Sequence, residues 1–285
     1  MPKSPHKKKK SSPARPRLAA PAVQAAPAVP LWRRPWSVPA FLVLLSAVLY
    51  AWTLRFPMVF DDDTYLLNNP MFRAESFGYP FRFHEFVNTP GTLGLDPDLA
   101  VNFVTRPVAY ATFYLNYLLG GWDTSGLRLF NVVIHAANAV LLWAVLRQLL
   151  GRLAARGSLS EASAAFIPAA AAVLFVAHPL AIESVTYIVQ RFTSLAAFWS
   201  LLAAWLYFRS TEEDMESRRV TRFRIAAGVV MLLGMLTKEC CVVIPLLILM
   251  VEMLVLGTHW KPALRRTLPL LLSLPVIPVL ILMAS

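Results

Sequence analysis

The sequence has few charged residues and almost no cysteine. Asp, Glu, Lys and Arg make up only 15% of its 285 residues, whereas 57% are hydrophobic and the mean hydropathy is +0.56. This composition excludes an ordinary water-soluble domain. The two cysteines, Cys240 and Cys241, are adjacent in an apolar run. They cannot form a disulfide framework, and nothing near them has the spacing of zinc ligands.

The sequence does contain apolar runs that are long enough to cross a bilayer. A membrane helix needs ~20 mostly apolar residues to cross a hydrocarbon core of ~30 Å. Lipid offers the backbone no hydrogen-bond partners, so such runs must be helices. The sequence therefore predicts an all-α polytopic membrane protein with about seven transmembrane helices. The predicted spans are residues 36–56, 127–150, 162–177, 192–208, 225–236, 240–256 and 268–283.

Acidic residues are absent from the first 36 positions, which contain nine Lys and Arg residues. This stretch is rich in Pro, Ala, Ser and Lys, and we expect a disordered tail over residues 1–36. The positive-inside rule places the tail in the cytoplasm. A topology signal that also attracts anionic lipid explains the lysines better than nucleic-acid binding does. The transmembrane domain is then predicted over residues 37–285.

The segment 57–126 carries charge of the opposite sign. It has eight acidic and three basic residues, which leaves a net charge of −5. The later basic clusters, at residues 147–156, 209–224 and 261–266, fall on the side of the tail if every predicted span crosses once. The sequence therefore predicts a large extracytoplasmic loop over residues 57–126 that contains amphipathic helices.

Three consecutive carboxylates open this loop, in "FDDDTYLLNNP". Asp61, Asp62 and Asp63 directly follow the first span, and we expect a short helix after them that ends at Pro70. Acids often occur where a helix enters water, but one would be enough for that purpose. The run favours a functional role.

Two further clusters involve helical spacing. Arg106 precedes Pro107 at the start of an expected amphipathic helix, where it could hold an anion, and the tyrosines that follow are interpreted as an interfacial aromatic belt. Asn131, His135 and Asn138 share one face of the second span. Hydrogen bonding between helices explains this stripe better than catalysis does.

The last cluster combines charged residues at the outer ends of the third, fourth and fifth spans. Either structural ion pairs or a binding role would account for them. With the aspartates, they would form a pocket for a substrate with a lipid tail and a phosphate head, where cations hold the phosphate and a carboxylate accepts a proton. The carboxylates could equally hold a metal ion, as in a metal-assisted lipid-phosphate hydrolase. The residues are His178, Glu183, Gln190, Arg191, Lys238 and Glu239.

Five motifs occur in a fixed order: "FDDDTYLLNNP", "RPVAYATFYLNYLLGG…D", "NVVIHAANAVLLW", "AHPLAIESVTYIVQR" and "KECCVVIPLL". From about residue 37 to the end, the chain resembles the amino-terminal membrane half of the GT-C glycosyltransferases that carry tetratricopeptide repeats. These enzymes are bacterial relatives of the transmembrane O-mannosyltransferases and, more distantly, of the protein O-mannosyltransferases.

This resemblance implies a polyprenyl-phosphate-linked sugar as donor and transfer to a hydroxyl outside the cytoplasm, on a polypeptide or another acceptor. No cofactor is expected and no metal ligand is assigned, although the sequence leaves the metal requirement open. The resemblance implies that Asp61 and Asp62 are catalytic and that Arg106, Arg191 and Lys238 stabilise the leaving phosphate. His178, Glu183, Gln190 and Glu239 would be supporting groups. The expected location is a bacterial inner membrane, with a cytoplasmic amino terminus and an extracytoplasmic active site.

Two features leave alternatives open. Family members continue through more spans and an array of repeats of about 34 residues, so the chain is expected to be a fragment or a truncated relative. A non-enzymatic membrane protein, such as a transporter half or a remnant, is the rival class. A transporter predicts midplane charges and an internal repeat. The expected charges lie at one face and no repeat is evident, which favours the transferase.

Overall fold

The computed structural model of the chain describes residues 34–69, 101–103, 105–212 and 215–284. These residues form helices and no strand, so the predicted all-α class is confirmed for this part of the chain. Residues 1–34 form one unit and residues 35–285 a second one. Residues 1–33 of the predicted tail and much of the predicted loop over residues 57–126 lie outside the described residues.

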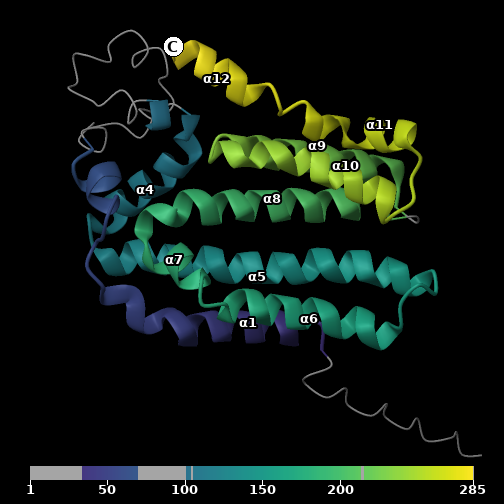
Figure 1. The fold of residues 1–285 in the computed structure, drawn as a ribbon, viewed down its shortest axis with the longest axis horizontal. Coiled ribbons are helices and arrows are strands. Elements are labelled where there is room, and N and C mark those ends of the chain that lie inside the picture. The colour runs from purple at the N-terminus through teal and green to yellow at the C-terminus, as the bar shows by residue number, and fades with distance from the viewer. Residues whose placement is uncertain (1–33, 70–100, 104, 213–214, 285) are drawn as a thin grey trace, which may run out of the picture. The chain divides into compact units, whose positions relative to one another are not determined.

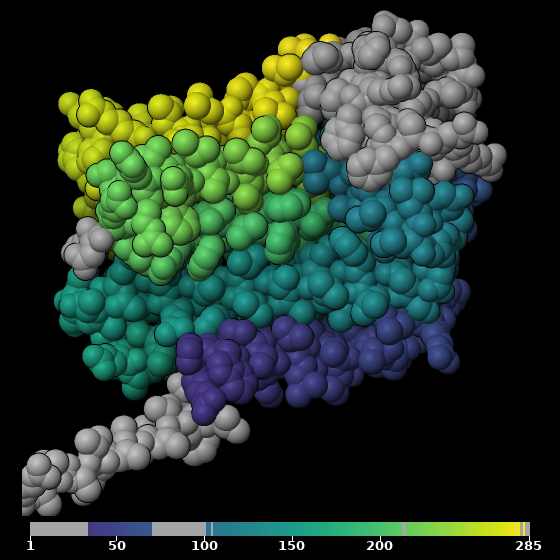
Figure 2. Space-filling view, turned by 180° about the vertical axis from the view of Figure 1, so that it is seen from behind, coloured from purple at the N-terminus to yellow at the C-terminus, as the bar shows by residue number. Residues whose placement is uncertain are grey.

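Helix α5 (Thr124–Ala155) is the central helix of the second unit. It begins where the Asp123 side chain accepts a hydrogen bond from the Gly126 amide, a common helix N-cap. It packs against α1 (Ser37–Tyr50), α6 (Glu161–Ala177) and α8 (Arg191–Arg209). Figure 1 shows these helices side by side, and from behind the purple band of α1 lies against α5 and α6 (Figure 2).

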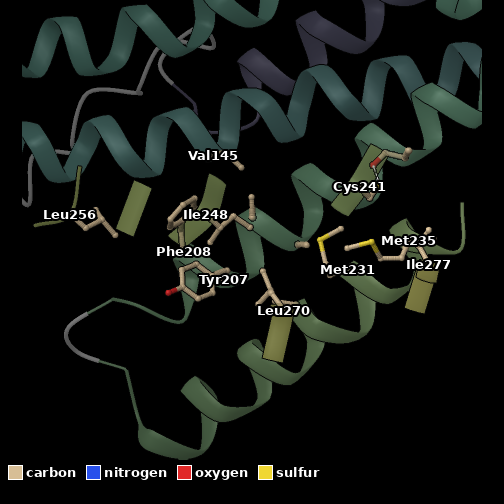
Figure 3. Close-up of a cluster of buried hydrophobic side chains, with 14 residues drawn as sticks. Val145, Tyr207, Phe208, Met231, Met235, Cys241, Ile248, Leu256, Leu270 and Ile277 are labelled. Atoms are coloured by element: carbon tan, nitrogen blue, oxygen red, sulfur yellow. Dashed lines mark hydrogen bonds between the residues drawn. The ribbon is translucent and has the colours of Figure 1, made fainter. Parts of the chain in front are cut away.

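A second layer of helices covers the other side of α8. It consists of α9 (Ser217–Met235), α10 (Ile244–Leu254) and α11 (Trp260–Leu271), which pack on α8 through α9. Their shared core is drawn in Figure 3, where Tyr207 and Phe208 of α8 lie among side chains of α9, α10 and α11. At Gly228 the backbones of α9 and α11 approach so closely that a Cβ would lie 2.8 Å from the Pro269 carbonyl oxygen.

The last predicted span, residues 268–283, is wrong in its extent. Helix α11 already begins at Trp260 and ends at Leu271, and α12 (Val276–Ala284) follows after a turn. Pro275 lies in this turn and has no backbone N–H, so it cannot continue a helix from α11. The prediction joined two helices because it used hydrophobicity alone.

Among the described residues, two helical segments are long and apolar enough to cross a membrane. They are Ser37–Arg55, which joins α1 to the turn η2 (Ala51–Arg55), and Thr124–Ala155. Helix α6 is also apolar but shorter, at 17 residues. The predicted total of about seven spans stays a prediction.

Candidate functional site

The aspartate run contacts a short turn, distant in sequence, at one end of the helices. This turn, η6 (Ile188–Gln190), connects α7 (Ala181–Thr186) with α8. Asp62 is fully buried: its Oδ1 accepts a hydrogen bond from the Val189 amide at 2.9 Å, and its Oδ2 accepts one from the Val59 amide at 3.2 Å. Burial raises the pKa of Asp62, although these hydrogen bonds and the charge of Arg128 oppose the shift. Asp62 therefore fixes the loop to the turn.

Asp61 differs from Asp62 in its exposure. Phe60, the preceding residue, has a φ of +52°, a left-handed conformation that is rare for a bulky side chain. This bend lets the Asp61 amide donate to the Tyr187 hydroxyl at 3.0 Å while the Asp61 side chain stays at the surface. Burial and the two neighbouring carboxylates raise the pKa of Tyr187 to about 12. The exposed carboxylate of the pair is therefore Asp61.

The expected short helix after the aspartates is present as η3 (Asp63–Leu67). Its predicted end at Pro70 lies outside the described residues. Asp63 is exposed, whereas both oxygens of Asp62 already accept amide hydrogen bonds. The run therefore presents two exposed carboxylates, Asp61 and Asp63, on either side of a buried one, and the metal-binding alternative stays a prediction.

Arg128 is a functional candidate that the sequence analysis missed. It lies in the first turns of α5 and is 1% exposed. Its guanidinium donates to the carbonyls of Phe56, Pro57 and Thr186, so it joins the chain before the aspartates to the end of α7. Its position one turn before Asn131, on the same helix face, was the signal that could have found it.

Arg191 lies at the start of α8 but does not face solvent. Its side chain is fully buried and donates to Asn131 at 2.9 Å, to Asn116 at 2.6 Å, and to the backbone carbonyls of Thr112 and Leu127. None of these partners is a carboxylate. The structure therefore places Arg191 inside the protein, where it joins α8 to α4 (Pro107–Gly120) and α5.

The polar stripe on α5 makes the interhelical bonds that were expected. Asn131 donates to the Ile188 carbonyl at 3.2 Å, and Asn138 donates to the Ser194 carbonyl at 2.8 Å. The interpretation of these two residues as interhelical contacts is confirmed. His135, between them, is described with the cavity below.

Lys238 reaches the same turn from the end of α9. Its Nζ donates to the Thr193 hydroxyl at 2.7 Å, and that hydroxyl donates to the Gln190 Oε1 at 2.9 Å. An ammonium group has three N–H donors, so this contact uses only one of them. Lys238 and Gln190 are thus brought together through Thr193.

Arg106 and Glu239 form an ion pair beside this cluster. Arg106 Nε and Nη2 donate to the two Glu239 oxygens at 3.1 and 2.9 Å. The amide of Val108 donates to the Leu236 carbonyl at 3.1 Å, which holds the start of α4 against the end of α9. Burial raises the pKa of Glu239, but hydrogen bonding and the charges of Arg106 and Lys238 outweigh this, and the net pKa is lowered.

The aromatic residues of α4 do not form an interfacial belt. Tyr110 and Phe113 are fully buried and Tyr114 is 6% exposed. They pack in one cluster with Leu66 after the aspartates and with Phe192 of α8. That interpretation was wrong because the aromatic face of α4 turns toward the protein, where it supports the aspartate loop.

His178 and Glu183 are exposed and lie apart from these contacts. The amide of Leu180 donates to His178 Nδ1 at 3.2 Å, and His178 lines a neighbouring cavity. Glu183 lies on α7, and its carboxylate makes no hydrogen bond or ion pair with the described residues. No contact joins either side chain to Asp61 or Lys238 in this part of the chain.

In comparisons with known proteins, the chain is similar to several protein O-mannosyl-transferases. The chain is 30% identical to fruit-fly "Protein O-mannosyl-transferase Tmtc2" over 209 residues, which are 71% of this chain and 20% of that protein. It is 27% identical to human "Protein O-mannosyl-transferase TMTC4" over 227 residues, which are 75% of this chain and 29% of that protein. Fruit-fly "Protein O-mannosyl-transferase Tmtc3" is 32% identical over 144 residues, 47% of this chain and 16% of that protein.

The predicted resemblance is confirmed. The chain spans less than a third of the length of these protein O-mannosyl-transferases. No family model matches the chain, and no solved structure matches it.

Proposed function

We propose that the chain is the membrane part of a glycosyltransferase that moves a sugar from a polyprenyl-phosphate-linked donor to a hydroxyl group of a polypeptide. The observation that supports this most is the position of the turn η6. The Asp61–Asp62 loop is bonded to Tyr187 and Val189 on one side of it, and the Lys238 ammonium reaches Gln190 through Thr193 on the other. An exposed carboxylate and a cation thus flank one three-residue turn.

In this proposal Asp61 is the base that accepts the proton of the acceptor hydroxyl. Its carboxylate is exposed, whereas both oxygens of Asp62 are already occupied. Asp62 and Arg128 then act as positioning residues, because they hold the loop that carries Asp61. A general base contributes ~10²–10⁴-fold to rate.

The leaving phosphate is held by Lys238 and Arg106. Lys238 has two N–H groups beyond the one bonded to Thr193, and Arg106 Nη1 makes no hydrogen bond with the described residues. Charge-assisted hydrogen bonds of this kind stabilise phosphate oxygens. Arg191, which the sequence analysis assigned to the phosphate, is instead a positioning residue at the start of α8. Glu239 orients Arg106, and Gln190 acts on Lys238 through Thr193.

The membrane arrangement belongs to the same proposal. About seven spans would place the amino terminus in the cytoplasm and the end of the helices that bears η6 on the extracytoplasmic side of a bacterial inner membrane. The names of the relatives support a sugar acceptor on protein. His178 and Glu183 stay candidates for the acceptor side of the site, since both are exposed near α7.

The test compares two neighbouring carboxylates. Membranes that contain the chain are incubated with a radiolabelled polyprenyl-phosphate mannose and a Ser/Thr-rich peptide, using the wild type, Asp61→Asn and Asp63→Asn. We expect Asp61→Asn to lower transfer by ~10²–10⁴-fold and Asp63→Asn, at a neighbour that is also exposed, to leave it near the wild-type level. Equal transfer by all three proteins, or its absence from all three, contradicts the proposal.

A further inference from the structure

A cavity of about 480 Å³ lies between α5, α6, α7 and α8, next to the site described above. Its wall is mostly apolar, from residues such as Ala171, Phe175 and Ala197. Two buried polar residues of α5, His135 and Asn138, also line it, and each is 1% exposed. The cavity therefore combines an apolar wall with a polar inner end.

Each of these two polar side chains has one atom without a partner. His135 Nε2 and Asn138 Oδ1 are buried and make no hydrogen bond with the described residues. A buried polar atom without a partner is costly, at ~1–3 kcal/mol. Such atoms are rare in native structures, so each indicates a group that pairs with it.

Asn138 Oδ1 is a hydrogen-bond acceptor, because the amide nitrogen of Asn138 donates to the Ser194 carbonyl. His135 Nε2 can pair with a hydroxyl group in either ring tautomer, because a hydroxyl both donates and accepts. The His135 ring is held between Phe175 at 4.9 Å and Tyr50 at 5.3 Å, measured between ring centres. The inner end of the cavity therefore matches a hydroxyl group, and the Asn138 oxygen disfavours an anion.

The exposed residues that line the cavity are Leu174 of α6, His178, and Leu180 before α7, and the two leucines are 68% and 73% exposed. On a helical rise of 1.5 Å per residue, His135 and Asn138 lie ~6 and ~10 Å further along α5 than Asn131, which is bonded to η6. A molecule that enters between the leucines thus meets His135 Nε2 and Asn138 Oδ1 below the level of the proposed transfer site.

We propose that this cavity binds a long-chain aliphatic alcohol, that is, a lipid whose hydroxyl group donates to Asn138 Oδ1 beside His135 Nε2 while its chain lies along the apolar wall toward Leu174 and Leu180. A purely hydrocarbon chain would leave both buried polar atoms unpaired. A phosphate or carboxylate would place a negative charge against the Asn138 oxygen. This binding does not depend on the proposed transfer reaction.

The test uses two photoreactive probes that differ by one donor. One is hexadecan-1-ol with a diazirine in its chain, and the other is its methyl ether, which has the same chain and an acceptor oxygen but no O–H. Each is irradiated with the chain in lipid nanodiscs without any sugar donor, and labelled peptides are quantified by mass spectrometry. We expect the alcohol to label the α6 segment around Ala171–Phe175 roughly five-fold more than the ether, the effect of about one net hydrogen bond.

Competition between unlabelled molecules provides an internal control. Unlabelled hexadecan-1-ol should compete at the α6 segment, and hexadecyl methyl ether should compete about five-fold less well.

Two variants test the hydrogen bond and the cavity separately. His135→Phe combined with Asn138→Leu should remove the preference for the alcohol and keep labelling by the ether. Ala197→Phe, which fills the cavity and leaves His135 and Asn138 in place, should abolish labelling by both probes and covers the case in which the double variant does not fold. Equal labelling of the wild type by alcohol and ether, or unchanged labelling in Ala197→Phe, overturns the proposal.

Discussion

The Asp62 carboxylate accepts a hydrogen bond from the Val189 amide at 2.9 Å, across 127 positions of the sequence. This contact joins the first acidic loop to the turn before α8. Burial raises the pKa of Asp62 in the folded chain above its ordinary value of 3.8. The contribution of Asp62 to stability therefore depends on pH. An acid whose pKa is raised by folding contributes stability that is full at low pH and is lost as the pH rises through the folded pKa.

Asp62→Asn should therefore remove a pH dependence of stability. We expect the unfolding temperature of the wild type, relative to that of Asp62→Asn, to fall as the pH is raised from 4 to 7. The comparison with the variant cancels the other titrating groups, including Glu239, whose lowered pKa has the opposite effect. A constant difference between the two proteins, measured by thermal unfolding in nanodiscs, would show that the Asp62 pKa is not raised.

Arg128→Met should destabilise the fold strongly. The substitution leaves the carbonyls of Phe56, Pro57 and Thr186 without their donor, and each lost partner costs ~1–3 kcal/mol. We expect a loss of about 3 kcal/mol or more in the free energy of unfolding. Arg147→Met on the same helix is the control, since Arg147 stacks on Trp143 and should cost less than ~1 kcal/mol. Similar losses in both variants would rule out the positioning role of Arg128.

Glu239→Gln should strengthen binding of the anionic donor. The carboxylate competes with a phosphate for the Arg106 guanidinium, and an exposed ion pair of this kind is worth up to ~1 kcal/mol. We expect the KM for the polyprenyl-phosphate sugar to fall by up to about five-fold, and Arg106→Gln to raise it. Glu161→Gln, on an exposed glutamate in the first turn of α6, should change neither. A higher KM in Glu239→Gln would mean that the orienting role of Glu239 on Arg106 outweighs its competition with the phosphate.

Gly228→Ala should separate two helices. Its Cβ would lie 2.8 Å from the Pro269 carbonyl oxygen, and a backbone atom cannot move away as a flexible side chain can. Overpacking of this kind costs ~1–3 kcal/mol, which should appear as a lower unfolding temperature. Gly151→Ala in α5 meets no atom within 4 Å and should be neutral or stabilising. A neutral Gly228→Ala would show that α9 and α11 are less closely packed than described.

Hydrophobicity predicted the helices that pack around α5 but not where every helix ends. The run of residues 268–283 looked like one span, yet Pro275 separates α11 from α12 because it lacks the N–H that a continuing helix needs. The aromatic face of α4 was visible in the spacing of Tyr110, Phe113 and Tyr114. Whether that face turned to lipid or to protein depended on Phe192, 78 or more positions away.

The site residues show the same limit. The sequence predicted that Asp62, Arg106, Gln190 and Lys238 lie near one end of the helices, but it could not distinguish a buried cation from an available one. Arg191 looked suited to a phosphate until its four protein acceptors were known. Glu252 was missed because a single acid in an apolar run forms no recognisable pattern. It is fully buried, and its Oε1 lies 2.8 Å from Arg266 Nη1 in an ion pair.

The turn η6 is shared by both halves of the proposed site, and this has a genetic consequence. Its Val189 amide anchors the loop of Asp61, and its Gln190 side chain receives the Thr193 hydroxyl that holds Lys238. A deletion within these three residues should disable proton removal and phosphate binding at once. Co-expression of two inactive variants, one changed at Asp61 and one with the deletion in the turn, should therefore not restore transfer, because the deletion disables both halves of the site.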